Sequence, residues 1–369
     1  MQLERPTLLL NEAICRRNIQ RMVAKTARLG LQFRPHFKTH QSRTIGTWFR
    51  EAGVKAITVS SVEMGLYFAA AGWQAITLAF PTYPAQMPLI NRLAASCQLR
   101  LVAESVAELT HLEKRLQHPV ELMIKVDVGG QRTGIAPDNT SLLLHLAKQL
   151  DRSSKLTFNG FLAHAGHTYR CRTAEQVRSI HEQVILKVGG LRQTFDPSYP
   201  GLIYSLGDSP SASLAENFEG IDELRPGVFV FFDWMQLGIG ACSYEDMALC
   251  MAAPVVALHP DRNEVVIHGG AIHFSKETWT ESSGDTHYGP VVLLDDAFQP
   301  LQLLEGTFLK KVSQEHGILR TTTETMQRFA PGQWIGVLPV HACLTANLIG
   351  SYQTLSGEKI DHFNRQAFI

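Results

Sequence analysis

The chain has 369 residues, of which 45% are hydrophobic, and its 34 Lys and Arg balance 34 Asp and Glu. Balanced charge excludes the strong field that recruits nucleic acid or an acidic membrane, and runs such as AITLAF are too short to span a bilayer. The N-terminus lacks an apolar signal core, and the six cysteines form no C-x-x-C pair. We therefore expect a cytoplasmic protein with reduced thiols.

Strand and helix patterns alternate along the first two thirds of the chain. Residues 12–30 predict an amphipathic helix that ends at Gly30. Apolar, strand-like segments then recur at 31–37, 54–60, 74–80, 98–103, 120–127, 156–165, 202–207 and 222–231. Amphipathic segments separate most of these strands, and Ser61 and Ser105 are typical helix N-caps. Regular alternation of this kind predicts a parallel sheet with helices outside it.

Eight such units favour a closed TIM (β/α)8 barrel over residues 12–245. The alternative is an open, doubly wound sheet, which would need fewer strands and a clear switch point. From residue 246 to 369 the segments are short, β-rich and separated by turn residues. This pattern predicts a second, C-terminal all-β domain, which the opening residues 1–11 are expected to join.

Four polar stretches follow predicted barrel strands, where the active residues of such barrels lie. They are RPHFKTH (34–40), DVGGQRTG (127–134), HAGHTY (164–169) and GDSPSA (207–212). Lys38 stands at a strand end beside His36 and His40, where partial burial would lower its pKa and suit Schiff-base formation. The alternative is an ordinary exposed lysine.

Two further motifs suggest ligand binding. Ser209 and Ser211 precede a helix expected to start at SLAEN, and small residues at a helix N-terminus form an anion site, although GDSP is also an ordinary capped turn. If WIGVLPVHAC is a strand, His341 and Cys343 point to the same face and suit a catalytic zinc ion. The alternative is a core cysteine beside an unrelated histidine.

The motifs RPHFKTH, DVGGQRTG, HAGHTY, GDSPSA, ELRPGVFVFFD, SQEHG and PVHAC, in this order, resemble one known family. It is the D-serine dehydratase/D-threonine aldolase group of fold-type III pyridoxal 5'-phosphate (PLP) enzymes, related to the N-terminal domain of alanine racemases. The resemblance implies a PLP site with one covalent attachment, a phosphate cradle and residues along the ring. These residues are Lys38 for the attachment, Ser209, Ser211, Gly227 and Val228 for the phosphate, and Arg132, His164, Tyr169 and Arg225 for the ring.

The resemblance also implies a metal and a reaction. His341 and Cys343 match the zinc pair (or a site for another divalent cation) of the dehydratase branch, whereas the aldolase branch has His-x-Asp. Arg225 would keep the pyridine nitrogen unprotonated. The implied activity is PLP- and zinc-dependent dehydration of a D-3-hydroxy amino acid to a 2-oxo acid and ammonia. A homodimer is implied, in which the β domain of one chain covers the barrel mouth of the other.

Three alternatives stay open on the sequence alone. One is a D-threonine aldolase-like enzyme, and the second is an amino-acid racemase that uses Tyr288 or Tyr352 of a second subunit. The third is a non-catalytic PLP-binding protein, although such proteins lack the second domain. The stretch HGGAIHFSKE replaces the family's usual Asp-Ala-Gly turn and adds His268 and His273. This departure leaves the exact substrate open.

Overall fold

The computed structural model describes residues 2–365, which fall into two compact units. We call them the barrel unit, mainly Ile19–Lys38 and Gly46–Gly227, and the strand unit, mainly Val228–His362 with the N-terminal residues up to Asn18. Residues 12–18, 39–45 and 228–245, which the sequence pattern placed with the barrel, group with the strand unit. The main segment of the barrel unit therefore ends at Gly227.

The barrel unit is built on eight parallel strands. They are β2 (Gln32–Phe33), β3 (Ile57–Val59), β4 (Ala75–Leu78), β5 (Gln98–Ala103), β6 (Val120–Val126), β7 (Leu156–Ala163), β8 (Ile203–Leu206) and β9 (Glu223–Leu224). The sheet runs β2-β9-β8-β7-β6-β5-β4-β3. Its edges meet where Phe37 N–H donates to Thr58 O (2.8 Å) and Thr58 N–H donates to Pro35 O (2.9 Å). All eight predicted strands and the barrel are thereby confirmed.

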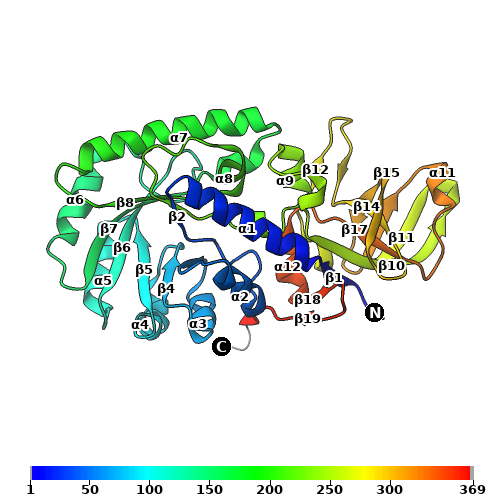
Figure 1. Ribbon diagram of the computed structural model, residues 1–369, viewed down its shortest axis with the longest axis horizontal. Helices are drawn as coiled ribbons and strands as arrows, with labels where there is room; N and C mark the ends of the chain where they lie inside the picture. The colour runs from blue at the N-terminus through cyan, green and yellow to red at the C-terminus, as the bar shows by residue number, and fades with distance from the viewer. Residues whose placement is uncertain (1, 366–369) are drawn as a thin grey trace. The chain divides into compact units, whose positions relative to one another are not determined.

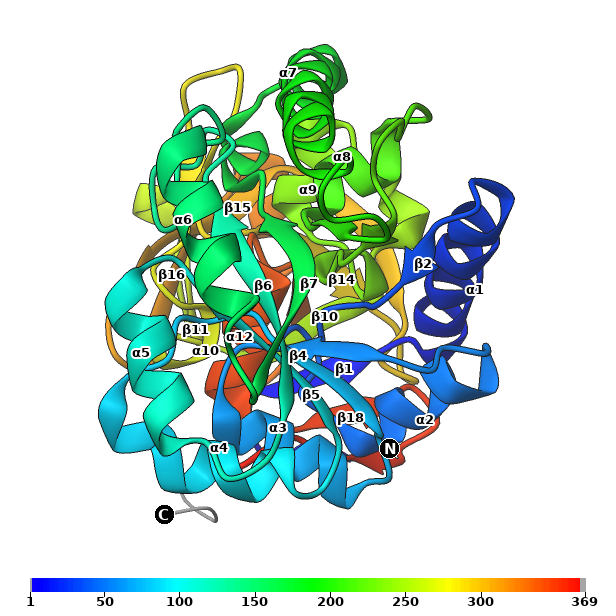
Figure 2. The same ribbon diagram turned by 90° about the vertical axis from the view of Figure 1, so that its left-hand side faces the viewer.

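Helices lie outside these strands, as Figure 2 shows for β4 to β7. The helices are α3 (Val62–Ala70), α4 (Met87–Ala94), α5 (Val106–Arg115), α6 (Thr140–Leu150), α7 (Ala174–Phe195) and α8 (Ser209–Leu214), while α1 (Glu12–Arg28) and α2 (Arg43–Glu51) cross from one unit to the other along the chain. Ser61 Oγ accepts Met64 N–H and Ser105 Oγ accepts Glu108 N–H, both at 3.2 Å. The two predicted N-caps are therefore confirmed.

The barrel encloses a layer of charged side chains. Glu223 is fully buried and pairs with Arg34 (2.6 Å) and Arg100 (3.0 Å). Ser205 Oγ donates to the same carboxylate (2.6 Å) and accepts a hydrogen bond from Nε of Arg225 (2.7 Å). Burial opposes ionisation of Glu223, but the charges of Arg34 and Arg100 outweigh it and lower its pKa. Through the hydroxyl of Ser205, this layer of buried charged side chains holds the side chain of Arg225 in place.

Glu223→Gln is expected to lower the free energy of unfolding by about 3 kcal/mol, because it leaves buried arginines without their counter-charge. The measurement is urea denaturation of the purified protein. Glu182→Gln, on the exposed face of α7, is the matched control and should change stability by less than about 0.5 kcal/mol. Equal stability of the two variants would mean that the buried layer is not held by this carboxylate.

The strand unit is mostly antiparallel (Figure 1). Its strands are β1 (Thr7–Leu10), β10 (Leu249–His259), β11 (Glu264–His268), β14 (Pro290–Leu294), β15 (Pro300–Val312), β16 (His316–Arg320), β17 (Trp334–Val337), β18 (Tyr352–Thr354) and β19 (Lys359–Ile360), with a hairpin of β12 (Trp279–Thr280) and β13 (Thr286–His287). Strands β11, β16, β15, β14, β17 and β10 close on themselves because β10 also pairs with β11. β1 pairs with β10, so the opening residues lie in this unit.

Short helices interrupt the strand unit where the sequence showed little helical periodicity. They are α9 (Trp234–Ile239), α10 (Ala271–Phe274), α11 (Thr323–Met326) and α12 (Ala342–Ile349). Each has eight residues or fewer, too short for periodicity to reveal it. α10 and α12 pack against each other.

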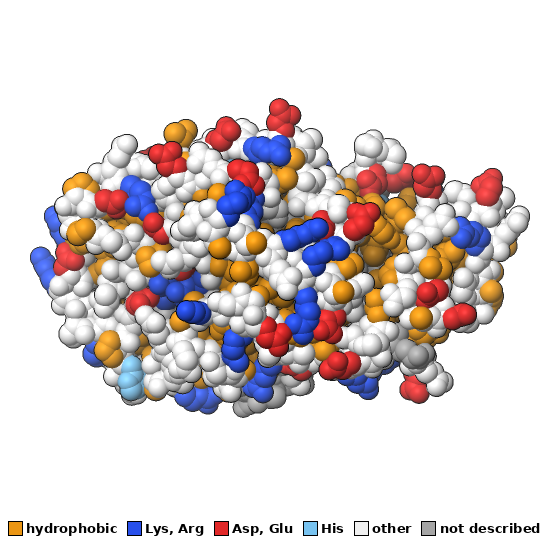
Figure 3. Space-filling view, in the orientation of Figure 1, with side chains coloured by type: hydrophobic (Ala, Val, Ile, Leu, Met, Phe, Trp, Pro, Cys, Tyr) orange, Lys and Arg blue, Asp and Glu red, His pale blue; other side chains and the backbone are white. Residues whose placement is uncertain are grey.

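The charges on one face of the molecule match the balanced composition. Figure 3 shows lysines and arginines interspersed with acidic residues, without a large field of one sign. None of the helices in residues 2–365 has the length and apolar character that a bilayer crossing needs.

Candidate active site

A packed aromatic cluster holds the loop that carries Lys38. Phe37 is fully buried, and its ring lies 4.9 to 5.1 Å, between centroids, from the rings of Phe49, Phe68 and Trp73. These contacts fix the backbone at the end of the first barrel strand. The side chain of Lys38 is itself exposed in this chain, unlike the partly buried amine that the sequence pattern favoured.

Most of the residues predicted to line the cofactor lie close enough together to shift one another's pKa values. Burial lowers the pKa of His36 well below its ordinary value and that of His164 to about 3. The positive charges of Lys38, Arg225 and Arg132 lower both pKa values further. Charges act on one another in this way only across short distances. Both histidines are therefore neutral at pH 7, in a site that is already strongly positive.

The contacts of His164 define its tautomer. Its Nδ1 lies within hydrogen-bond distance of Gly207 O, and a carbonyl oxygen can only accept. Nδ1 therefore carries the proton, and Nε2 keeps a lone pair. A Cβ at Gly166 would lie 3.0 Å from Nε2, so the glycine leaves this nitrogen accessible.

The predicted phosphate cradle begins at Asp208. Its Oδ1 accepts Ser211 N–H at 2.7 Å, so that α8 starts at Ser209 and ends at Leu214. The predicted helix start at SLAEN was therefore wrong, because the buried Asp208 caps the chain earlier. Ser209 N–H donates to Tyr169 Oη (3.1 Å), and Gly227 N–H donates to Ser209 Oγ (3.1 Å).

Ser211 gives the best indication of a ligand in this loop. The residue is 1% exposed, and among the residues that the structure describes its Oγ makes no hydrogen bond of good geometry, although it lies close enough to the Asp208 carboxylate to lower the pKa of that group. Buried hydroxyl groups normally have a partner, and a phosphate oxygen would supply one. Gly207 contributes by being small, since a Cβ there would lie 3.1 Å from Arg225 O. These features fit a phosphate group. Val228 was also predicted to bind the phosphate; it follows Gly227 directly and is the first residue of the main segment of the strand unit.

The side chain of Arg225 is fixed in position and can act only as a hydrogen-bond donor. It is buried, and Nη2 donates to Ala163 O while Nε donates to Ser205 Oγ. Burial lowers the pKa of Arg225, which the nearby Glu223 partly offsets, to about 10. The guanidinium remains protonated at neutral pH and has no acceptor atom. Such a group fits an unprotonated ring nitrogen, as expected from the sequence.

His341 and Cys343 do not lie on a strand. β17 ends at Val337, His341 is the N-cap of α12, and Cys343 lies in its first turn. The same-face argument from strand geometry was therefore wrong. Trp234 N–H donates to Pro339 O (3.1 Å), which bends the chain away from the sheet before the two residues are reached.

Asp233 orients the predicted metal pair. It is 2% exposed, and its Oδ2 accepts Ala342 N–H at 2.9 Å and lies 3.8 Å from Nδ1 of His341. A carboxylate on the Nδ1 side leaves Nε2 for a metal ion. The thiol of Cys343 donates to Thr39 Oγ1 (3.3 Å), and Thr39 follows Lys38 in the chain. Imidazole and thiolate form a suitable donor pair for zinc, with positions left for water and substrate.

Asp233→Asn is expected to weaken metal binding about 10- to 100-fold, because an amide orients the imidazole less well and supports its donor strength less. Asparagine still caps a helix, so α9 should form. The measurement is competition between the protein and a chromogenic chelator for zinc. Asp261→Asn, at an exposed position of the same unit, is the control. Equal zinc affinity of the two variants would remove Asp233 from this role.

A second histidine cluster lies in the strand unit. Among the described residues, one group of three possible metal ligands has all its ligand atoms within 4.8 Å, namely His268, His273 and Glu315. His268 Nε2 lies 3.2 Å from Glu315, but Nδ1 of His273 accepts Gly270 N–H at 3.1 Å. Nε2 of the neutral His273 is then protonated and offers no lone pair to a metal. We therefore interpret this cluster as a hydrogen-bonded group.

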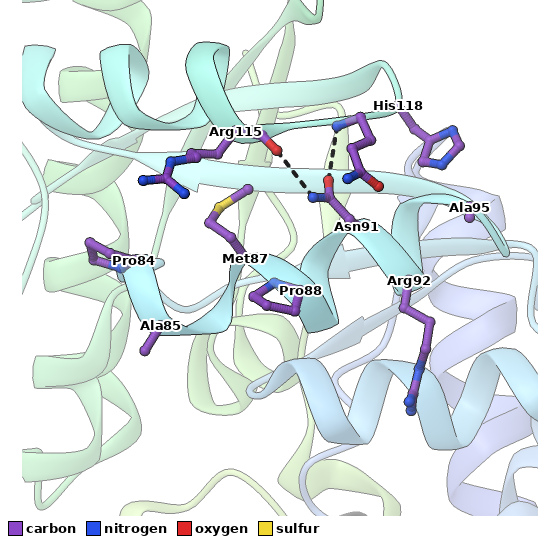
Figure 4. Close-up of a pocket in the computed structure, with 10 residues that line it drawn as sticks. Pro84, Ala85, Met87, Pro88, Asn91, Arg92, Ala95, Arg115 and His118 are labelled. Atoms are coloured by element: carbon purple, nitrogen blue, oxygen red, sulfur yellow. Dashed lines mark hydrogen bonds between the residues drawn. The ribbon is translucent and has the colours of Figure 1, made fainter.

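A wide hollow in the barrel unit contains none of the predicted site residues. It measures about 700 Å³ and lies beside α4 and the end of α5 (Figure 4). The Asn91 side chain donates to Arg115 O (3.1 Å) and accepts Gln117 N–H (2.9 Å). The exposed groove therefore has a structural explanation, since Asn91 holds the connection from α5 to β6.

Sequence reasoning missed two carboxylates of the site. Asp208 lies within GDSPSA and Asp233 ends ELRPGVFVFFD, but neither received a role. Both are buried and both cap short helices. An acidic residue directly after an apolar run was the available signal for each N-cap.

A closed parallel barrel with a lysine after its first strand, a phosphate-type cradle after its seventh and a separate strand unit defines the alanine racemase-like class of PLP enzymes. The family model "Alanine racemase, N-terminal domain" matches residues 11–234, and "Putative serine dehydratase domain" matches residues 248–355. The chain belongs to the D-serine dehydratase family of PLP-dependent lyases. The predicted family is therefore confirmed.

Individual relatives cover almost the whole chain. D-threo-3-hydroxyaspartate dehydratase of Delftia sp. is 30% identical over 97% of this chain and 96% of its own. D-serine dehydratase of Dictyostelium discoideum is 25% identical over 96% and 94%. A solved structure of a cysteine-to-alanine variant of D-threo-3-hydroxyaspartate dehydratase, in the metal-free form, has a TM-score of 0.90 at 28% identity and covers 98% of each chain.

Proposed function

We propose that the protein is a PLP- and zinc-dependent lyase that removes water from a D-3-hydroxy amino acid and releases a 2-oxo acid and ammonia. One observation carries the proposal: Thr39, the residue after Lys38, accepts the hydrogen bond of the Cys343 thiol. Cys343, a predicted metal ligand, thus contacts the residue that directly follows the predicted cofactor lysine in the chain. The dehydratase relatives of both substrate types support the same reaction class.

The barrel residues would position the cofactor and move protons. PLP, when bound, supplies an electron sink for the charge that develops at the substrate Cα. Lys38 would hold the cofactor and, once released from it, take the proton from Cα. Ser209, Ser211 and Gly227 would bind the phosphate. Arg225 would donate to the ring nitrogen and so moderate its pull on electrons.

The strand unit would hold the metal ion that assists departure of the 3-hydroxyl group. His341 and Cys343 would hold zinc or another divalent cation, which provides a Lewis acid for a 3-hydroxyl group. Cys343 must lose its thiol proton to become a ligand, so metal binding is expected to tighten as the pH rises. A thiol at this position, where the aldolase branch has a carboxylate, favours dehydration over aldol cleavage.

A racemase is less consistent with the position of Tyr352. The tyrosine is buried, and its hydroxyl donates to His40 O at 2.7 Å within the same chain. It is thus not presented as an acid to a second subunit. We propose a cytoplasmic homodimer on the family resemblance, and light scattering should then give twice the chain mass of 41.0 kDa.

The test is turnover by the PLP-loaded protein with D-serine, D-threo-3-hydroxyaspartate and D-threonine, each beside its L-isomer. We expect ammonia and a 2-oxo acid from D-isomers alone, with loss of activity in a chelator and recovery with zinc. Glycine and an aldehyde from D-threonine would instead establish an aldolase. Interconversion of D- and L-isomers without ammonia would establish a racemase.

A further inference from the structure

A cavity of about 270 Å³ in the barrel unit adjoins two residues of the proposed cofactor site. Arg132 and His164 form part of its lining, and so do Lys125, Arg170 and His167. These residues come from the end of β6, the loop after it and the loop after β7. The cavity thus shares two lining residues with the proposed cofactor site, and the proposed function leaves most of it without a role.

The cavity carries more positive charge than its own residues neutralise. Its cations are Lys125, Arg132 and Arg170, and its one carboxylate is Asp127. Asp127 is engaged by the loop itself, since Oδ1 accepts Gly129 N–H and Oδ2 accepts Gln131 N–H, both at 2.9 Å. The carboxylate therefore shapes the loop and leaves the cavity with a net charge of about +2.

Neither arginine side chain has a partner in the part of the chain that the structure describes. Within residues 2–365, the guanidinium groups of Arg132 and Arg170 make no hydrogen bond and no ion pair. Nδ1 of His167 is buried and likewise has no hydrogen-bond partner there. Lys125 is 5% exposed and donates to Thr133 Oγ1. Two guanidinium groups without partners, a buried ammonium and a half-buried imidazole together form a set of groups that suits an anion.

The protonation of Lys125 agrees with this arrangement. Burial, followed by the charge of Arg132, lowers the pKa of Lys125 to about 8. The ammonium is therefore destabilised, because burial and the charges of Arg132 and Arg225 outweigh those of the nearby Glu104 and Asp127. A bound carboxylate would supply the missing negative charge and restore the pKa toward its ordinary value.

We propose that this cavity is a subsite for the side-chain carboxylate of an acidic D-3-hydroxy amino acid, bound by Arg170 and Lys125. The inference rests on the proposed function and narrows its substrate class. The net charge supports this proposal. If Arg132 is assigned to the cofactor ring, the remaining charged groups of the cavity are Lys125, Arg170 and Asp127. Their charges sum to +1, which one substrate carboxylate would balance. A neutral hydroxymethyl side chain, as in D-serine, would leave Arg170 without a partner.

The test compares kcat/KM for D-threo-3-hydroxyaspartate and for D-serine in the holoenzyme and its Arg170→Gln variant. We expect the ratio of the two values to fall about 10- to 100-fold in the variant, because a charge-assisted contact to the side chain is lost. Arg170 is exposed and without partners, so the variant should fold. Arg178→Gln, at an exposed position of α7, is the matched control and should leave the ratio unchanged.

A second measurement is independent of catalysis. Succinate should bind the holoenzyme more tightly than butyrate in calorimetry, and Lys125→Met should remove most of this difference. An equal loss of kcat/KM for both substrates in Arg170→Gln would place the α-carboxylate here and overturn the inference. So would an unchanged ratio. Failure of the proposed function is distinguishable, because the wild-type holoenzyme would then dehydrate neither substrate.

Discussion

Lys38→Ala is expected to lower kcat for dehydration by about four orders of magnitude. The variant removes both the covalent attachment of the cofactor and the group that takes the Cα proton, and residues that act as one unit show losses of this size. Phe37 holds the loop through its aromatic contacts, so the fold should survive the change. The measurement is ammonia release by the PLP-saturated variant, with circular dichroism to verify folding.

The matched control for this prediction is Lys55→Ala, which removes an exposed lysine from the same unit. It should retain full activity and a normal visible spectrum. Rescue of the Lys38→Ala variant by an added primary amine would support the proton-transfer role, since a free amine can take the place of the missing side chain. Activity of Lys38→Ala within tenfold of wild type would exclude the residue from the chemistry.

Loss of the metal pair is expected to have the second largest effect. His341→Ala and Cys343→Ala should each lower kcat for dehydration about 10³-fold, because hydroxide is a poor leaving group without a Lewis acid. The cofactor should stay bound, since neither residue belongs to the predicted PLP site. Metal analysis and the visible spectrum of the same sample separate the two sites.

Cys97→Ala is the control, because its half-buried thiol donates to the backbone carbonyl of Leu93 and belongs to neither predicted site. It should bind one zinc ion per chain, as the wild type is expected to do. His268→Ala should also keep this stoichiometry, given that the hydrogen bond of Gly270 blocks the neighbouring His273 as a ligand. A drop to zero in His268→Ala would move the metal to the second cluster.

The barrel was predictable because its signals are local. Alternation of apolar strands with amphipathic helices appears directly in the sequence, as do N-caps such as Ser61 and Ser105. Placing Lys38 at a strand end required only the strand boundary and the rule that such barrels carry their chemistry there. The family motifs then linked it to a cofactor.

The remaining features depend on contacts distant in sequence. His341 and Cys343 read as alternate strand residues until Asp233 and Trp234, more than 100 positions away, bind the segment and turn it into a helix start. The charged layer around Glu223 is another case, because a strand pattern does not reveal that polar side chains meet inside a barrel. Nothing in the sequence indicated a binding role for Arg170, because exposed arginines outside regular strands and long helices are common.

The most direct test of the function is to identify the residue that binds the cofactor. The PLP-loaded protein is reduced with borohydride, digested and analysed by tandem mass spectrometry. We predict that the mass of one reduced pyridoxyl phosphate group is found on the peptide that contains RPHFKTH, at Lys38. The group on another lysine, or an unmodified protein after saturation with PLP, would contradict the proposed function.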